Sequence, residues 1–90
     1  MTDTELLVGV WEAAGEEPRT AEFHADGTLT YTIDFGERSL VMEMIWRIEG
    51  GIMVIDQPSA PGEERSVYRL VDHDTLVLEH GGESFTYVRT

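Results

Sequence analysis

The chain has 90 residues, 41% of them hydrophobic, and a net charge of −12 from 18 acidic against six basic residues. This length allows one small domain, residues 1–90, and the hydrophobic content excludes intrinsic disorder. The charge disfavours binding to nucleic acid or to an anionic membrane, and the absence of cysteine excludes disulfides and thiolate chemistry.

The first segment, MTDTELLVG, has neither the basic start nor the long apolar run of a secretory signal or a transmembrane helix, so we expect a cytoplasmic protein. The run Leu7–Ala13 fits a helix face as well as a strand, and Thr2 with Glu5 forms a capping-box pattern. We therefore predict a short helical turn over residues 3–7 and a strand over the rest of the run.

The rest of the chain alternates apolar and polar residues in short runs, which is typical of β-strands. Residues 40–48 also fit a helix, but five alternating positions that lead into Gly50-Gly51 favour a strand. Asp26-Gly27 and Gly81-Gly82 likewise predict tight hairpin turns. The predicted strands are Arg19–Ala25, Thr28–Asp34, Ser39–Glu49, Ile52–Asp56, Arg65–Val71, Thr75–His80 and Glu83–Arg89.

Eight short strands in succession predict an all-β fold, a compact antiparallel up-and-down eight-stranded barrel whose closure removes exposed strand edges. Such a barrel is just wide enough to be filled by side chains or to hold one small ligand. Because many inward residues are large, we expect a mostly filled interior with a shallow mouth. The predicted inward residues are Trp11, Phe23, Leu29, Tyr31, Ile33, Met42, Met44, Trp46, Ile48, Tyr68, Leu70, Leu76, Leu78, Phe85 and Tyr87.

Two motif residues lie at opposite ends of the chain, Trp11 on the first predicted strand and Arg89 on the last. Gly9-Val10-Trp11 on the first strand is similar to the Gly-x-Trp motif that opens lipocalin and other calycin barrels, and Arg89 is similar to the arginine that packs across that tryptophan. The chain is far shorter than a typical lipocalin and lacks its C-terminal helix and disulfides. The resemblance implies a lipocalin-like barrel that binds small apolar molecules at its open end. For Trp11 and Arg89 we predict structural roles, a core side chain and a cation–π lid.

The longer connections gather at one end of the predicted barrel, because an up-and-down barrel places alternate connections at opposite ends. Residues 14–18, 35–38 and 57–64 lie at this end and carry five glutamates. Loops at a barrel mouth are frequent ligand sites, so we predict a non-catalytic site for a small apolar or cationic ligand here. The inward residues nearest this mouth are Ile33, Met42, Tyr68, Leu78 and Phe85.

The sequence holds no motif for catalysis, a metal or a cofactor. The histidines have no metal-ligand spacing and the serines lie in no nucleophile motif, so we expect no cofactor and favour a non-enzyme. Asp34 with Glu37 and Asp56 with Glu63 are the two candidate carboxylate pairs with a raised pKa, but water screens charges on exposed loops, so we assign neither pair a proton-transfer role. Two alternatives remain, which are an acidic inhibitor, immunity or accessory protein for a basic protein partner, and a barrel-type cyclase.

The outward positions of the last three predicted strands carry valines where a polar face is expected. Val67, Val77 and Val88 are predicted to form one apolar stripe, and contiguous apolar patches usually mark interfaces. We therefore predict a homodimer with two-fold symmetry through this face.

Overall fold

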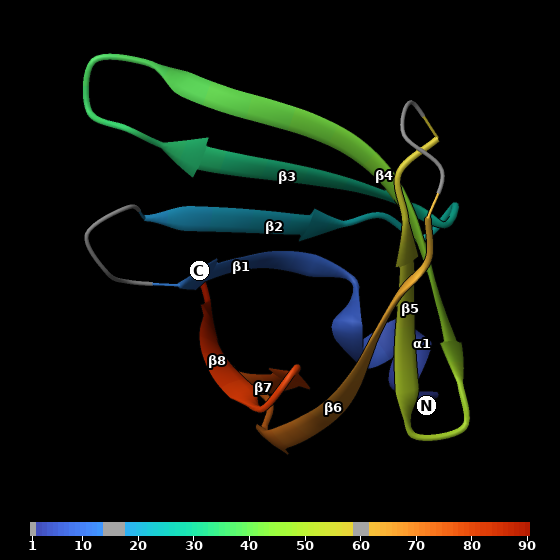
Figure 1. Ribbon diagram of the computed structural model, residues 1–90. Coiled ribbons are helices and arrows are strands. Elements are labelled where there is room, and N and C mark those ends of the chain that lie inside the picture. The colour runs from blue at the N-terminus through green and yellow to red at the C-terminus, as the bar shows by residue number, and fades with distance from the viewer. Residues whose placement is uncertain (1, 14–17, 59–61) are drawn as a thin grey trace.

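The computed structural model describes residues 2–13, 18–58 and 62–90, and these form one closed barrel (Figure 1). Each strand pairs antiparallel with its neighbours along the chain, and β1 pairs with β8 to close the barrel. The predicted up-and-down, all-β barrel with an N-terminal helical turn is confirmed. The elements are α1 (Asp3–Leu7), β1 (Gly9–Ala13), β2 (Arg19–Phe23), β3 (Thr28–Asp34), β4 (Ser39–Glu49), β5 (Ile52–Asp56), β6 (Glu64–Asp72), β7 (Thr75–His80) and β8 (Glu83–Arg89).

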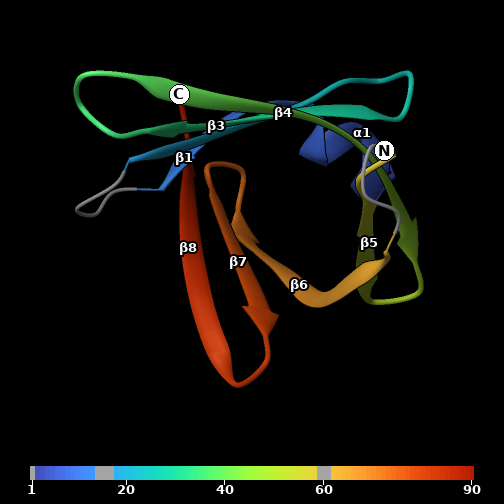
Figure 2. The same cartoon turned by 45° about the horizontal axis from the view of Figure 1, so that its top comes forward.

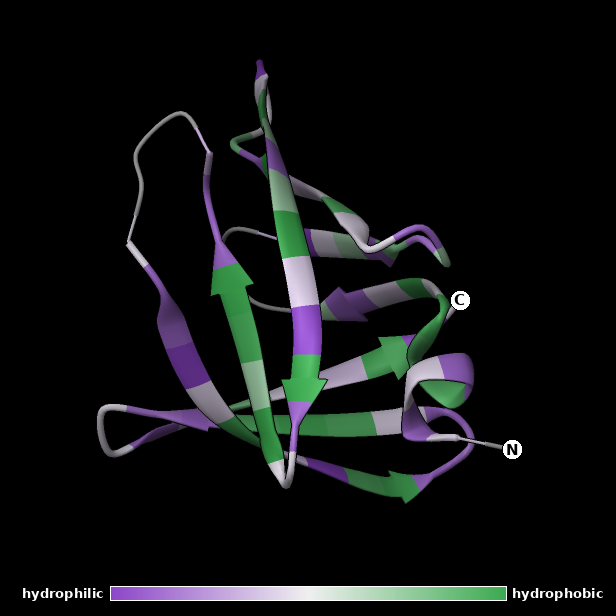
Figure 3. Ribbon diagram, turned by 90° about the vertical axis from the view of Figure 1, so that its right-hand side faces the viewer, coloured by the Kyte–Doolittle hydropathy of each residue, from purple (hydrophilic) through white to green (hydrophobic). Residues whose placement is uncertain are grey.

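The alternation of side chains along the strands separates the inside of the barrel from the outside. Figure 2 shows β1 to β4 along one side and β5 to β8 curving back to meet β1. In the register of β2, β3 and β4, Ala21 lies beside Tyr31, and Tyr31 beside Met42, all three facing inward. Apolar and polar residues alternate along the strands in the same way in Figure 3. This period of two is what the sequence pattern predicted.

Three strands differ in their ends from the prediction. β1 begins at Gly9, after α1, and β6 is one residue longer at each end, with an irregular register between Leu70 and Asp72. β2 ends at Phe23 rather than at Ala25. The reason is local, because the Asp26 carboxylate accepts hydrogen bonds from the Thr28 backbone N–H (2.9 Å) and hydroxyl (2.6 Å). The turn therefore spans four residues instead of two.

α1 covers one end of the barrel, which we call the closed end. The Thr2 hydroxyl accepts a hydrogen bond from the Glu5 backbone N–H at 3.2 Å, the N-cap contact that the sequence predicted. Leu7 is fully buried, and its carbonyl accepts a hydrogen bond from the Trp11 indole N–H at 3.0 Å. The helix is thereby tied to the first strand of the barrel.

Arg89 covers Trp11 at the closed end. Its guanidinium carbon lies 4.2 Å from the centre of the Trp11 ring, so the predicted core and lid roles are confirmed. The guanidinium also donates hydrogen bonds to the carbonyls of Val8 (3.0 Å) and Leu6. Gly9 makes room for it, because a Cβ atom at that position would lie 2.5 Å from Arg89 Nη1. Gly9 also has a φ of +139°, which favours glycine.

Large side chains fill the half of the barrel next to α1. Trp46 packs edge-on against Phe23 with ring centres 4.9 Å apart, and its indole N–H donates to the His24 carbonyl at 3.2 Å. Met53 on β5 is fully buried in the same core, although the prediction named no inward residue on that strand. The predicted inward residues all face the interior, either in this core or around the cavity described next.

Candidate ligand-binding cavity

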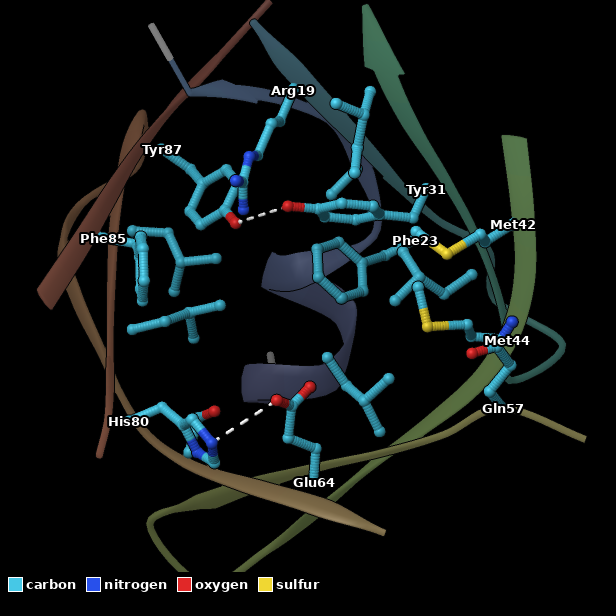
Figure 4. Close-up of a pocket in the computed structure, with 17 residues that line it drawn as sticks. Arg19, Phe23, Tyr31, Met42, Met44, Gln57, Glu64, His80, Phe85 and Tyr87 are labelled. Carbon is cyan, nitrogen blue, oxygen red and sulfur yellow. Dashed lines mark hydrogen bonds and ion pairs between the residues drawn. The ribbon is translucent and has the colours of Figure 1, made fainter. Parts of the chain in front are cut away.

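The barrel is hollow at the end opposite α1, which we call the open end (Figure 4). A cavity of about 350 Å³ opens there and reaches down to Phe23, Leu29 and Leu76, which are almost completely buried. The cavity is therefore deeper than the shallow mouth expected from the size of the inward residues. The prediction was based on side-chain size alone, and side-chain size does not determine how far apart the barrel walls lie.

Four of the five predicted site residues line this cavity. They are Ile33, Met42, Leu78 and Phe85. The fifth, Tyr68, does not line it, and its hydroxyl instead donates a hydrogen bond to the Asp3 carboxylate on α1. This bond, with a smaller effect of burial, raises the pKa of Tyr68 to about 12. Tyr68 therefore belongs to the closed end.

Tyr68 was misplaced because β6 begins at the mouth with polar residues. Glu64 and Ser66 alternate with Tyr68 along β6, so all three have inward parity, which means that their side chains point to the inner face of the barrel. Glu64 and Ser66 lie closer to the mouth, and both line the cavity. They are not among the predicted site residues, which are all large and mainly apolar. Their parity in the sequence was the signal that identifies them.

A cluster of three polar side chains, Arg19, Tyr31 and Tyr87, occupies one wall of the cavity (Figure 4). The two tyrosine hydroxyls are hydrogen-bonded to each other at 3.2 Å. Burial raises the pKa of Tyr87 well above its usual value, and the hydrogen bond with Tyr31 adds to this effect. Arg19 is not among the predicted site residues, although it alternates with Ala21 and Phe23 on the inner face of β2.

Figure 4 shows a second polar pair, His80 and Glu64, across the cavity from Arg19. His80 Nδ1 donates to the Arg65 carbonyl at 2.9 Å, and its Nε2 lies 3.4 Å from the Glu64 carboxylate. Both side chains are about half exposed to solvent. Among the described residues, the rim of the cavity therefore carries charged groups of both signs. The acidic mouth stays a prediction, because residues 14–17 and 59–61 of its predicted loops lie outside the described residues.

Acidic residues near the mouth also have structural partners. Glu63 pairs with Arg47 at 2.6 Å and with Arg65 at 3.1 Å. The hydrogen bond from Arg47 lowers the pKa of Glu63, so Glu63 does not form a carboxylate pair with a raised pKa. Asp56 instead accepts a hydrogen bond from the Gly62 backbone N–H at 3.1 Å. In the same way, the Asp34 carboxylate accepts from the Gly36 backbone N–H at 2.8 Å and holds its turn.

The valines of the predicted dimer face lie on the outside of the barrel. Val67 and Val88 are about half exposed. The register places Val67 opposite Glu79, and Val77 between Arg69 and Thr86, so the valines follow a diagonal with polar neighbours instead of one unbroken stripe. The homodimer stays a prediction.

The described part of the chain shows neither a cluster of metal ligands nor a membrane-spanning helix. Residues 2–13, 18–58 and 62–90 contain no group of three or more His, Asp or Glu side chains placed to hold a metal ion. Among the same residues, no helix has both the length and the apolar character needed to cross a membrane.

The fold and the cavity together define a closed, antiparallel eight-stranded β-barrel with one filled end and one hollow end. Comparison with known proteins gives no closer assignment, because no family model, no curated protein and no solved structure matches the chain. What the barrel does therefore has to be argued from its own residues.

Proposed function

We propose that this protein is a lipocalin-like barrel that binds a small, mainly apolar molecule in the cavity at its open end, without catalysis. The observation that carries the proposal is the cavity itself. Its volume of about 350 Å³ lies within the range of roughly 300–1,000 Å³ that is usual for small-molecule sites. It is also lined mainly by apolar side chains with a few polar ones, as such sites are.

The free energy of burying apolar surface at the open end and the side-chain packing at the closed end support the same proposal. A ligand in the cavity removes the apolar side chains of its wall from contact with water, which is favourable. Each CH₂ group that a ligand buries against Leu29, Leu76 and Met44 is worth about 0.8 kcal/mol. The arrangement of Gly9, Trp11 and Arg89 at the closed end supports the lipocalin-like part of the proposal, because it fits the resemblance that the sequence suggested.

The proposal is tested by titrating 1-octanol, a neutral apolar probe, into the protein by calorimetry. We expect saturable binding with one site. Ala21→Leu places a larger side chain in the cavity and is expected to weaken binding at least about tenfold, by steric exclusion. Thr86→Leu is the matched control, since Thr86 is exposed on the outer face of β8 and does not line the cavity.

Equal binding by the wild type and Ala21→Leu would place the octanol outside the cavity and would contradict the proposal. Absence of any binding would contradict it as well. The acidic module for a basic protein partner and the cyclase both stay predictions, because no contact among the described residues favours either one.

A further inference from the structure

We infer that the ligand of this cavity carries an anionic head group, such as a carboxylate, that binds against Arg19, Tyr31 and Tyr87. The inference rests on the proposed function and narrows it to one chemical class of ligand, an apolar carboxylate. It replaces the cationic ligand that the net charge of the chain suggested.

The hydrogen bonding of the tyrosine pair favours an acceptor on the ligand. Only one hydrogen lies between the Tyr31 and Tyr87 hydroxyls, which are 3.2 Å apart. The hydroxyl that accepts this hydrogen keeps its own hydrogen for a further acceptor. A carboxylate offers acceptor oxygens only, and hydrogen bonds to a charged acceptor are the stronger ones.

The local charge also favours an anion at this wall. Burial is the main reason why the pKa of Tyr87 is raised, but charged neighbours act on it too. Arg19 is one of them, and its positive charge lowers this pKa, so it favours negative charge at the Tyr87 hydroxyl.

The overall charge of −12 acts on this wall less directly than Arg19 does. Charges on the outer surface are screened over about 8 Å at physiological ionic strength, whereas a head group at the tyrosine pair lies close to the Arg19 guanidinium. Glu64 lies across the cavity from Arg19, with its carboxylate 3.4 Å from His80 Nε2. A guanidinium additionally matches the two oxygens of a carboxylate in a fork-like geometry.

Apolar surface for the rest of such a ligand lies next to the tyrosine pair. The floor of the cavity is formed by Phe23, Leu29 and Leu76, which are apolar and almost completely buried, and Leu76 is the ladder partner of Tyr87. A carboxylate at the tyrosine wall therefore leaves its hydrocarbon body over this floor. One polar wall above an apolar floor is the arrangement expected for an amphipathic ligand.

The test compares three probes with the same chain length, namely octanoate, 1-octanol and octylammonium, by calorimetry at neutral pH. We expect octanoate to bind at least about tenfold more tightly than octylammonium, and more tightly than 1-octanol. Arg19→Gln is expected to weaken octanoate binding about tenfold and to change 1-octanol binding less than about twofold. Arg69→Gln is the matched control, because Arg69 is exposed on β6 and does not line the cavity.

A second variant keeps the test independent of how Arg19→Gln folds. Tyr31→Phe retains the ring and removes one hydroxyl of the pair, and we expect it to weaken octanoate binding about threefold or more. Octanoate that binds no more tightly than 1-octanol, with no effect of either variant, would overturn the inference. The proposed function would survive that result if Ala21→Leu still blocked 1-octanol. If none of the three probes binds, the proposed function fails and the inference fails with it.

Discussion

The two ends of the barrel are built from the same alternating strands, yet one is solid and the other is hollow. At the closed end, Trp11 is completely buried. The Arg89 guanidinium stacks on its ring, and its indole N–H donates a hydrogen bond to the Leu7 carbonyl at the end of α1. At the open end, a cavity of about 350 Å³ remains between side chains such as Met42 and Phe85, which are only half-buried. The difference separates stability from binding, because the closed end holds the barrel together and the open end leaves space for a ligand.

The largest expected effect is the loss of Trp11 at the closed end. Trp11→Ala removes a fully buried ring, its hydrogen bond to Leu7 and the surface on which Arg89 stacks. We expect a loss of about 3–5 kcal/mol in the free energy of unfolding, which is a large part of the stability of a small domain. Urea unfolding followed by circular dichroism measures it. A loss below about 1 kcal/mol would contradict the closed-end core.

Gly9→Ala tests how closely Arg89 approaches the chain. The new Cβ would lie 2.5 Å from Arg89 Nη1 and the positive φ would be strained. Gly36→Ala is the matched control, with a φ of +91° and open space around it. We expect backbone strain of about 1–3 kcal/mol in both variants, and about 2 kcal/mol more for Gly9→Ala from displacing Arg89. Equal losses in urea unfolding would mean that the guanidinium moves away without cost.

Two methionines allow the same substitution in the two environments. Met53 is fully buried in the core, whereas Met42 is half-buried and borders the cavity. Met53→Ala is expected to cost about 3 kcal/mol and Met42→Ala about 1 kcal/mol, because a side chain beside an existing space loses fewer contacts. Equal costs in parallel urea unfolding experiments would show that the open end is packed like the core.

The smallest effect concerns alkaline pH and the contact between Tyr68 and Asp3. This hydrogen bond, and to a lesser extent burial, raises the pKa of Tyr68 to about 12, above the value of about 10 for a tyrosine in an unfolded chain. The stabilisation is therefore complete below pH 10 and is lost as the pH rises from 10 to 12. The chain has no lysine or cysteine, so tyrosines are the side chains that titrate in this window.

Tyr68→Phe isolates that contribution. The free energy of unfolding of the wild type should fall from pH 10 to pH 12. That of Tyr68→Phe should fall less steeply, because the contribution of Tyr68 is gone. It should still fall, because the raised pKa of Tyr87 contributes in both proteins. Stability measured in urea at several pH values gives the two slopes. Identical slopes would contradict the role of the Asp3 contact.

The barrel was predictable from the sequence because its determinants are local. Glycine-bearing turns such as Gly50-Gly51 and the alternation of residues 28–34 fix where strands begin and which side chains face inward. The cavity was not predictable in the same way. Parity showed that Leu29 and Met42 face inward, but whether opposite walls touch depends on barrel radius and on distant strands.

The polar part of the site was missed for a different reason. Arg19, Glu64 and Ser66 have inward parity, but polar residues at strand ends usually face solvent, so the pattern alone gave them no priority. Tyr68 shows the opposite error. Tyr68 faces inward and is aromatic, yet its hydroxyl donates a hydrogen bond to Asp3, a residue 65 positions away in the chain.

The most direct test of the central claim, that the open end binds the ligand and the closed end does not, uses methionine methyl groups as reporters. In NMR spectra of protein with ¹³C-labelled methionine methyls, 1-octanol should shift the signals of Met42 and Met44, which line the cavity. The signal of Met53, buried in the core outside the cavity lining, should stay in place. A shift of Met53 equal to those of Met42 and Met44, or no shift of any of the three, would contradict the account.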